Sequence, residues 1–202
     1  MQFSRRFLLS LVPATALAST AVPVVARADD DLTRAERSVG KPDAKVVVQE
    51  FFSLTCTHCA AFSQETFPQI KTELIDKGLV RWVFQDYPLD RTALTASMVA
   101  RYLPVDRYLP FIDALFATQN RWAFNRGNNP TDELWKTAAL AGMSRPTFDK
   151  AINDTALRDW ILKQQQAATD KWKIDSTPSF VIDNQKYAGE ISFEAFRKLI
   201  PS

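Results

Sequence analysis

Two apolar, β-branched runs on either side of a helical pattern place the strongest constraint on the fold. The first run, KVVVQEFF, covers residues 45–52, and the second, LVRWVFQDY, covers residues 79–87. Continuous runs of this kind are typical of strands that are buried on both faces of a sheet. Between them, apolar residues recur at helical spacing until Gly78, a residue type that commonly ends helices. The pattern predicts a β-α-β unit, with Pro68 as a kink in its helix.

The middle of the chain, residues 88–173, has the pattern of a helical block. Its apolar residues recur at helical spacing with few β-branched runs, and the pattern is broken at Pro104, at the loop NRGNNP and at Gly142. These breaks predict a block of four or five helices.

Strand signals return only in the last part of the chain, residues 174–202. PSFVID and QKYAG indicate a hairpin with Asp183 and Asn184 at its turn, and SFEAFRKLI indicates a final helix capped by Ser192. The expected fold class is therefore α/β. Residues 46–87 and the last part would form one domain, with the helical block inserted between them.

The first 28 residues have the features of a cleaved export signal. Arg5 and Arg6 precede an uncharged stretch from Phe7 to Val25, and ARA at residues 26–28 matches the small-x-small pattern of a signal-peptidase site. A membrane anchor is the alternative, although two prolines interrupt the uncharged stretch. We expect cleavage at this site and export to the periplasm, by a twin-arginine or another route.

Removal of this leader changes the charge balance of the chain. It leaves 22 basic and 23 acidic side chains, a net charge of −1, which gives no argument for a nucleic-acid partner. Residues 29–45 are polar and are expected to form a short extended or helical lead-in. Apolar residues make up 46% of the whole chain, enough for one buried core.

Both cysteines and the only histidine lie in the segment SLTCTHCAA. A disulfide between Cys56 and Cys59 would close a loop of four residues and stabilise a fold little. A zinc site needs four ligands, and the chain offers only these cysteines and His58. A Cys-His hydrolase needs a histidine from elsewhere in the chain. We therefore expect a redox dithiol without metal or cofactor, with an inert buried pair as the alternative.

The expected position of the dithiol, at the start of a helix, favours redox chemistry. Unpaired amides at a helix N-terminus and the neighbouring imidazole of His58 would lower the pKa of Cys56. We expect Cys56 to be the exposed sulfur that is attacked. Cys59 lies one turn later and is expected to face inward as the resolving cysteine.

Three features together carry a family resemblance over roughly residues 40–199: EFFSLTCTHC, the helical block, and STPSF. The chain resembles the DsbA-like thiol:disulfide oxidoreductases of the thioredoxin superfamily. This resemblance implies a thioredoxin fold with an all-α helical insertion. It also implies that Pro178 follows a cis peptide bond and that the backbone of Thr177 binds an extended client peptide. An ordinary turn is the alternative for this dipeptide.

Glu50 matches an acidic residue that the family places on the strand beneath the dithiol. Its neighbours Val48, Phe51 and Phe52 would remove water from the carboxylate and raise its pKa, which suits proton transfer with Cys59. A strand residue that faces solvent is an equally weighted alternative.

The resemblance leaves the direction of the redox reaction open. The dipeptide Thr57-His58 and the residue Thr177 depart from the strong oxidases, and threonine before the cis-proline also occurs in disulfide isomerases. Those isomerases resemble dimers joined through an amino-terminal domain, which residues 29–45 cannot supply. We expect a monomer that oxidises exported cysteine-containing proteins and is reoxidised by a DsbB-like membrane partner. A disulfide isomerase or reductase, and a periplasmic chaperone or peptide-binding module, are the alternatives.

Overall fold

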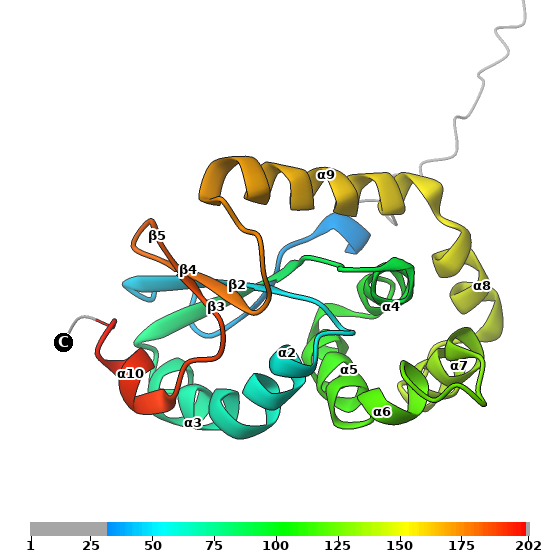
Figure 1. The fold of residues 1–202 in the computed structure, drawn as a ribbon, viewed down its shortest axis with the longest axis horizontal. Helices are drawn as coiled ribbons and strands as arrows, with labels where there is room; N and C mark the ends of the chain where they lie inside the picture. Colours follow the sequence, from blue (N-terminus) through cyan, green and yellow to red (C-terminus); the bar gives the residue numbers. More distant parts are fainter. Residues whose placement is uncertain (1–31, 201–202) are drawn as a thin grey trace, which may run out of the picture.

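A five-stranded mixed sheet lies at the centre of the computed structural model, which describes residues 32–200 (Figure 1). The predicted signal peptide, residues 1–28, lies outside the described residues. Only β2 and β3 run in parallel, and the other neighbours are antiparallel. The strand order is β1-β3-β2-β4-β5, with β1 at Arg37–Val39, β2 at Val46–Phe52, β3 at Val80–Asp86, β4 at Ser179–Ile182 and β5 at Gln185–Ala188.

The strand β2 occupies the middle of the sheet, as its continuous apolar run predicted. Val48 lies opposite Trp82 of β3 and Ile182 of β4. Val48 and Trp82 are fully buried, because helices cover both faces of the sheet at this point. Figure 1 shows α9, Thr155–Trp172, on one face, and α3, Phe67–Ile70, on the other.

The lead-in before β2 contributes a strand that its sequence does not indicate. Arg37–Val39 pairs with β3 and forms one edge of the sheet. Arg37 is only 1% exposed, and its guanidinium donates a hydrogen bond to the carbonyl oxygen of Arg101 at 2.8 Å. Tertiary contacts of this kind, rather than an apolar pattern, hold the segment in the sheet.

One helical path follows the cysteines, as predicted, but two stretches of it are π-helical. Pro68 lies in the first turn of α3, directly after the first π-helical stretch. Proline has no N–H to donate, and the wider π turn before it accommodates this loss. Gly78 follows the path with a φ of 75°, a conformation that glycine adopts without strain. The path consists of α2 at Thr57–Ala61, a π stretch at Phe62–Thr66, α3, and a π stretch at Lys71–Ile75.

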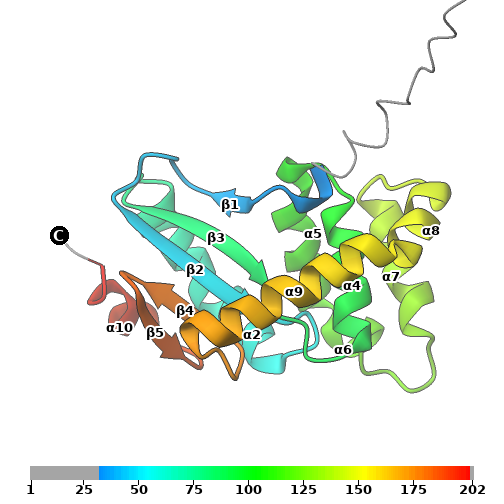
Figure 2. The ribbon, with the colours of Figure 1, turned by 90° about the horizontal axis from the view of Figure 1, so that it is seen from above.

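The helical block contains six helices among the described residues, where four or five were predicted. The additional helix is the four-residue α6, which is too short to give a periodic pattern. Figure 2 shows that most of the block lies beyond one end of the sheet, while α9 runs back across the sheet. The other helices are α4 at Arg91–Arg101, α5 at Val105–Ala117, α6 at Gln119–Trp122, α7 at Pro130–Leu140 and α8 at Arg145–Asn153.

The end of the chain follows the prediction closely. Asp183 and Asn184 form the hairpin turn between β4 and β5, with positive φ angles of 47° and 63°. The final helix, α10, spans Phe193–Arg197, and the side chain of Ser192 accepts a hydrogen bond from the N–H of Ala195 at 3.3 Å. The hairpin and this cap are both encoded by local turn and capping residues.

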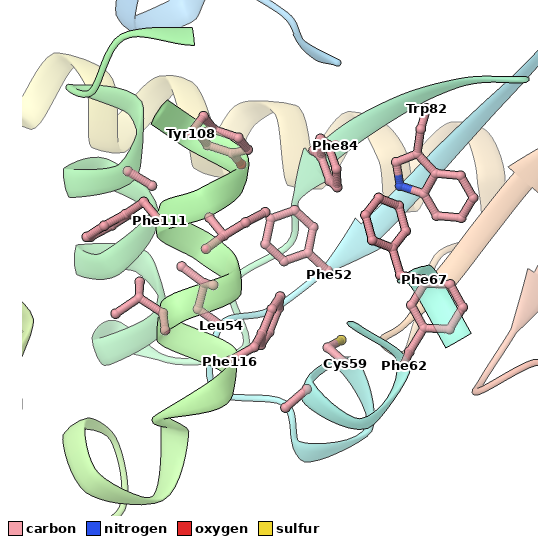
Figure 3. Close-up of a cluster of buried hydrophobic side chains, with 14 of the residues drawn as sticks. Phe52, Leu54, Cys59, Phe62, Phe67, Trp82, Phe84, Tyr108, Phe111 and Phe116 are labelled. Atoms are coloured by element: carbon pink, nitrogen blue, oxygen red, sulfur yellow. The ribbon is translucent and has the colours of Figure 1, made fainter. Parts of the chain in front are cut away.

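An aromatic cluster joins the sheet to the helix that carries the cysteines (Figure 3). The ring of Phe62 stacks on Trp82 with centroids 6.0 Å apart, and Phe52 meets Phe116 edge-on at 5.9 Å. Cys59 belongs to the same buried cluster. This packing fixes the start of the helix and gives the second cysteine apolar surroundings. Within residues 32–200, no helix is long and apolar enough to cross a membrane.

Candidate active site

The two cysteines lie where β2 leads into α2. Cys56 is the N-cap residue of α2, and its backbone is extended, with φ −83° and ψ 120°. The backbone N–H groups of His58 and Cys59 lie at this helix start and help to lower the pKa of Cys56. Cys56 therefore occupies the N-cap position beside the unpaired amides of the helix start, although its side chain makes no capping hydrogen bond.

The structure buries Cys56 more deeply than the sequence predicted. Cys59 is fully buried, as expected, but Cys56 is only 8% exposed where an exposed sulfur was expected. Two segments distant in sequence cover it. The Cys56 sulfur donates a hydrogen bond to the carbonyl oxygen of Thr177 at 3.2 Å, and the Gln119 side chain donates to the Cys56 carbonyl oxygen at 3.0 Å.

The pKa values of the two cysteines shift in opposite directions. The pKa of Cys56 falls to about 5, first because the Cys59 thiol donates to its sulfur, and further through the side chain of Thr177 and the amides at the helix start, while burial opposes this fall. The pKa of Cys59 lies well above its ordinary value, first because of burial and then because of Cys56. At neutral pH, Cys56 is a thiolate and Cys59 keeps its proton.

The main polar contact of His58 is with Glu190 and not with the Cys56 sulfur. Its side chain is 72% exposed, and its Nδ1 contacts the carboxylate of Glu190. This contact raises the pKa of His58, first through the hydrogen bond and then through the charge of Glu190, while Cys56 makes the smallest contribution that raises it. Thr57 beside it is exposed. No local sequence pattern indicates this role of Glu190, which lies 132 positions from His58.

The Thr177-Pro178 segment lies beside the dithiol, as the family resemblance implied. The peptide bond between these residues is cis. The Thr177 carbonyl oxygen accepts the hydrogen bond from Cys56, and the Pro178 carbonyl oxygen accepts one from the N–H of Gly189 at 2.8 Å. This loop, the cysteines and the segment after β5 therefore form one continuous site.

Glu50 lies inside the protein, so the alternative of a solvent-facing residue is wrong. It is 4% exposed, and its Oε2 accepts a hydrogen bond from the indole N–H of Trp82 at 2.8 Å. Burial raises its pKa to about 8, and the hydrogen bond from Trp82 limits the rise. The negative charge of Glu50 in turn helps to raise the pKa of Cys59.

A second acid faces Glu50, and the sequence did not predict it. Glu50 and Asp113 of α5 line the same small cavity of about 10 Å³, which has room for at most one water molecule. Ser63 donates a hydrogen bond to Asp113 at 3.2 Å, and burial raises the pKa of Asp113. Among residues 32–200, no group of three or more His, Cys, Asp or Glu side chains is placed to hold a metal ion.

Comparisons with known proteins agree with this geometry. The thioredoxin family model matches residues 32–202. The crystal structure of α-DsbA1 from Wolbachia pipientis is 30% identical, with a TM-score of 0.76, and the match covers 83% of this chain and 89% of that one. BdbD from Bacillus subtilis shares the fold, with a TM-score of 0.72 at 20% identity over 82% of this chain and 90% of that one.

Sequence relatives point the same way. A Rickettsia bellii protein whose name provisionally assigns it to the protein-disulfide oxidoreductases is 27% identical over 72% of this chain. The chain spans only 56% of the length of that protein. Disulfide bond formation protein D of Bacillus subtilis is 25% identical, over 80% of this chain and 74% of its own length. The chain therefore belongs to the thioredoxin family, as a DsbA-type member with a helical insertion.

Proposed function

We propose that the protein is a periplasmic thiol oxidase that introduces disulfides into exported proteins through Cys56 and Cys59. The observation that carries this proposal is the pKa of about 5 at Cys56 beside a raised pKa at Cys59. A stable thiolate lowers the free energy of the reduced form. The disulfide form is therefore the stronger oxidant.

The first step of the proposed reaction opens the protein disulfide. A client thiolate attacks the Cys56 sulfur, the bond between Cys56 and Cys59 breaks, and its electron pair goes to the Cys59 sulfur. Because Cys59 is fully buried, this sulfur needs a proton. Glu50 has a pKa of about 8 and holds a proton at pH 7, which it donates to Cys59.

The second step releases the oxidised client. The second thiolate of the client attacks the client sulfur of the mixed disulfide, and Cys56 leaves as a thiolate. Its low pKa makes Cys56 the better leaving group of the two cysteines. The client loses two electrons and gains a disulfide, the protein dithiol gains both electrons, and Glu50 recovers a proton from solvent.

The loop at Thr177 and Pro178 is the proposed contact for an extended client segment. Its backbone lies within 3.2 Å of the Cys56 sulfur, so a strand paired with this loop would bring its own sulfur to Cys56. We further propose export by the predicted signal peptide, action as a monomer, and reoxidation by a DsbB-like membrane protein. Names such as disulfide bond formation protein D among the relatives support this direction of reaction.

A direct test uses the oxidised protein and a reduced peptide with two cysteines. We expect close to one equivalent of peptide disulfide per protein, followed by mass spectrometry. Prior reduction and alkylation of Cys56 and Cys59 should abolish the reaction. If the alkylated protein still suppresses aggregation of an unfolded client while the oxidised protein forms no peptide disulfide, the chain is a chaperone or binding module instead.

Replacement of Glu50 by glutamine tests its role as the proton donor. Glu50→Gln keeps the shape and retains an acceptor for Trp82, but it cannot donate the carboxyl proton. We expect the attack on Cys56 at pH 7 to slow by roughly 100-fold, a typical contribution of general acid catalysis. A fluorescent peptide in stopped flow measures this rate. An unchanged rate would remove Glu50 from the mechanism.

The same variant should change stability in a defined direction. The folded pKa of Glu50, about 8, lies above its unfolded value of about 4.3, so the native protein loses stability as pH rises between these values. Glu50→Gln lacks this loss and should gain about 3 kcal/mol relative to the native protein between pH 4 and pH 7. Urea unfolding at both pH values measures this gain. Glu65→Gln, an exposed acid in the helical path, is the matched control and should show no gain.

A further inference from the structure

The contact between His58 and Glu190 joins the dithiol helix to a distant loop. The side chains of His58 and Glu190 are 72% and 43% exposed, so surrounding atoms do not confine either of them. The ring Nδ1 of His58 nevertheless contacts Oε1 of Glu190. His58 is the residue between the two cysteines that lies directly before Cys59. Glu190, a residue from another part of the chain, therefore influences the charge of His58.

The backbone holds Glu190 in this position. Gly189 precedes it with a φ of 88°, a conformation that favours glycine, and donates its N–H to the Pro178 carbonyl oxygen at 2.8 Å. Thr177, the residue before Pro178, accepts the hydrogen bond from the Cys56 sulfur. Gly189 therefore links Glu190 to the loop that contacts Cys56. The side chain of Glu190 contacts His58, the residue directly before Cys59.

We propose that Glu190 is a positioning residue that orients the His58 imidazole and keeps it charged to higher pH than a free histidine, so that the charge beside the dithiol persists further into the neutral range. The ion pair stands on the geometry alone. Its meaning for catalysis rests on the proposed function of the dithiol.

Two groups act on His58, and they explain why the pair matters for redox chemistry. Glu190 raises the pKa of His58, and the charge of Cys56, which only the reduced form carries, raises it further. Without Glu190, His58 would titrate near its ordinary pKa of about 6.5. Reduction would then draw a further fraction of a proton onto His58, because thiolate formation and imidazole protonation favour each other. With Glu190 present, the imidazole stays protonated to higher pH, so this coupling is weaker at neutral pH.

The chain offers a clean probe, because His58 is its only histidine. The imidazole resonances of the protein therefore report one titration by NMR. We expect Glu190→Gln to lower the midpoint toward about 6.5 in the oxidised form, and Glu190→Asp to give a midpoint between this value and that of the native protein. Glu194→Gln removes the same charge from an exposed residue four positions later and should leave the midpoint unchanged.

The redox consequence is measured as an equilibrium constant with glutathione at pH 6 and pH 8. Loss of the carboxylate changes this constant by the same factor at both pH values, so the ratio of variant to native isolates the charge of His58. For Glu190→Gln we expect that ratio to fall from pH 6 to pH 8 by at most about threefold, the scale of a surface charge pair. By reciprocity, the His58 midpoint of this variant should differ by about 0.5 pH unit between the reduced and oxidised forms.

Each outcome decides the proposal. A lowered midpoint in Glu190→Gln, an unchanged midpoint in Glu194→Gln and a fall in the ratio from pH 6 to pH 8 support it. An unchanged midpoint in Glu190→Gln overturns it, and so does a lowered midpoint with a constant ratio, because His58 would then have no link to the dithiol. If these results hold but no client peptide is oxidised, the proposed function fails while the role of Glu190 in setting the charge beside the dithiol stands.

Discussion

The reduced protein should be more stable than the oxidised protein at pH 8 and less stable at pH 5. The folded pKa of Cys56, about 5, lies below the unfolded value of about 8.5. A lowered pKa contributes stability that is complete above the unfolded pKa and is lost as pH falls through the folded one. Only the reduced form has this thiolate, so only the reduced form gains from it.

The sizes of two stabilising contributions, from the thiolate and from the disulfide, decide whether the reduced or the oxidised form is more stable at each pH. At about 1.36 kcal/mol per unit between the folded pKa and pH 8, the thiolate contributes on the order of 4 kcal/mol at pH 8. The disulfide closes a loop of four residues and stabilises the oxidised form by at most about 2 kcal/mol. Near pH 5 the stabilisation by the thiolate is almost lost, so the oxidised form should be the more stable of the two.

Other groups do not disturb this comparison. Cys59 has a raised pKa and holds its proton through this range in the folded reduced protein. Glu50 destabilises both redox forms as pH rises, so its effect largely cancels in their difference. Thermal melts of both forms from pH 5 to pH 8 measure the gap. A gap that does not change with pH would contradict the thiolate assignment.

Removal of either cysteine should have opposite effects on trapped intermediates. Cys59→Ala leaves a Cys56 thiolate that can attack a disulfide in a client, which forms a mixed disulfide and releases one client thiolate, but the variant lacks the thiol that resolves this mixed disulfide. We expect this variant to hold clients as covalent adducts, with at least about tenfold more adduct than the native protein, because no sulfur within the site can release them. Non-reducing gels after acid quenching measure the adducts.

Cys56→Ala should form no such adducts. Its only sulfur, Cys59, is fully buried and has a raised pKa, so it neither ionises at neutral pH nor meets a client. Both variants keep a small apolar residue at the changed position and should fold. Equal trapping by the two variants would mean that the roles of the cysteines are assigned the wrong way round.

The sequence predicted those parts of the fold that local patterns encode. The continuous run at Val46–Phe52 identifies a central strand, and the turn at Asp183 and Asn184 identifies the hairpin. The strand at Arg37–Val39 was not predicted, because its place in the sheet depends on Arg37 and its distant carbonyl partners. The helix α6 was not predicted, because its four residues are too few to show a helical period of apolar residues.

From the residues alone, the site was predicted only where its members are neighbours in sequence, and the distant Thr177 and Pro178 were added by the family resemblance. Cys56, His58 and Cys59 share one segment, whereas Glu190 and Asp113 reach the site only through the folded chain. The environment of Glu50 could not be decided either, because an apolar run without alternation does not tell which face of the strand is buried. Sheet register and the indole of Trp82 decide it in the structure.

The reduction potential of the dithiol against glutathione tests the central claim most directly. The low pKa of Cys56 stabilises the reduced form, so the potential should lie near about −120 mV, in the range of strong thiol oxidases. Oxidised and reduced protein can be separated by their tryptophan fluorescence or by alkylation and mass spectrometry at equilibrium. A value near −120 mV is what a thiol oxidase requires, whereas a value at or below about −180 mV, where isomerases and reductases lie, would contradict it.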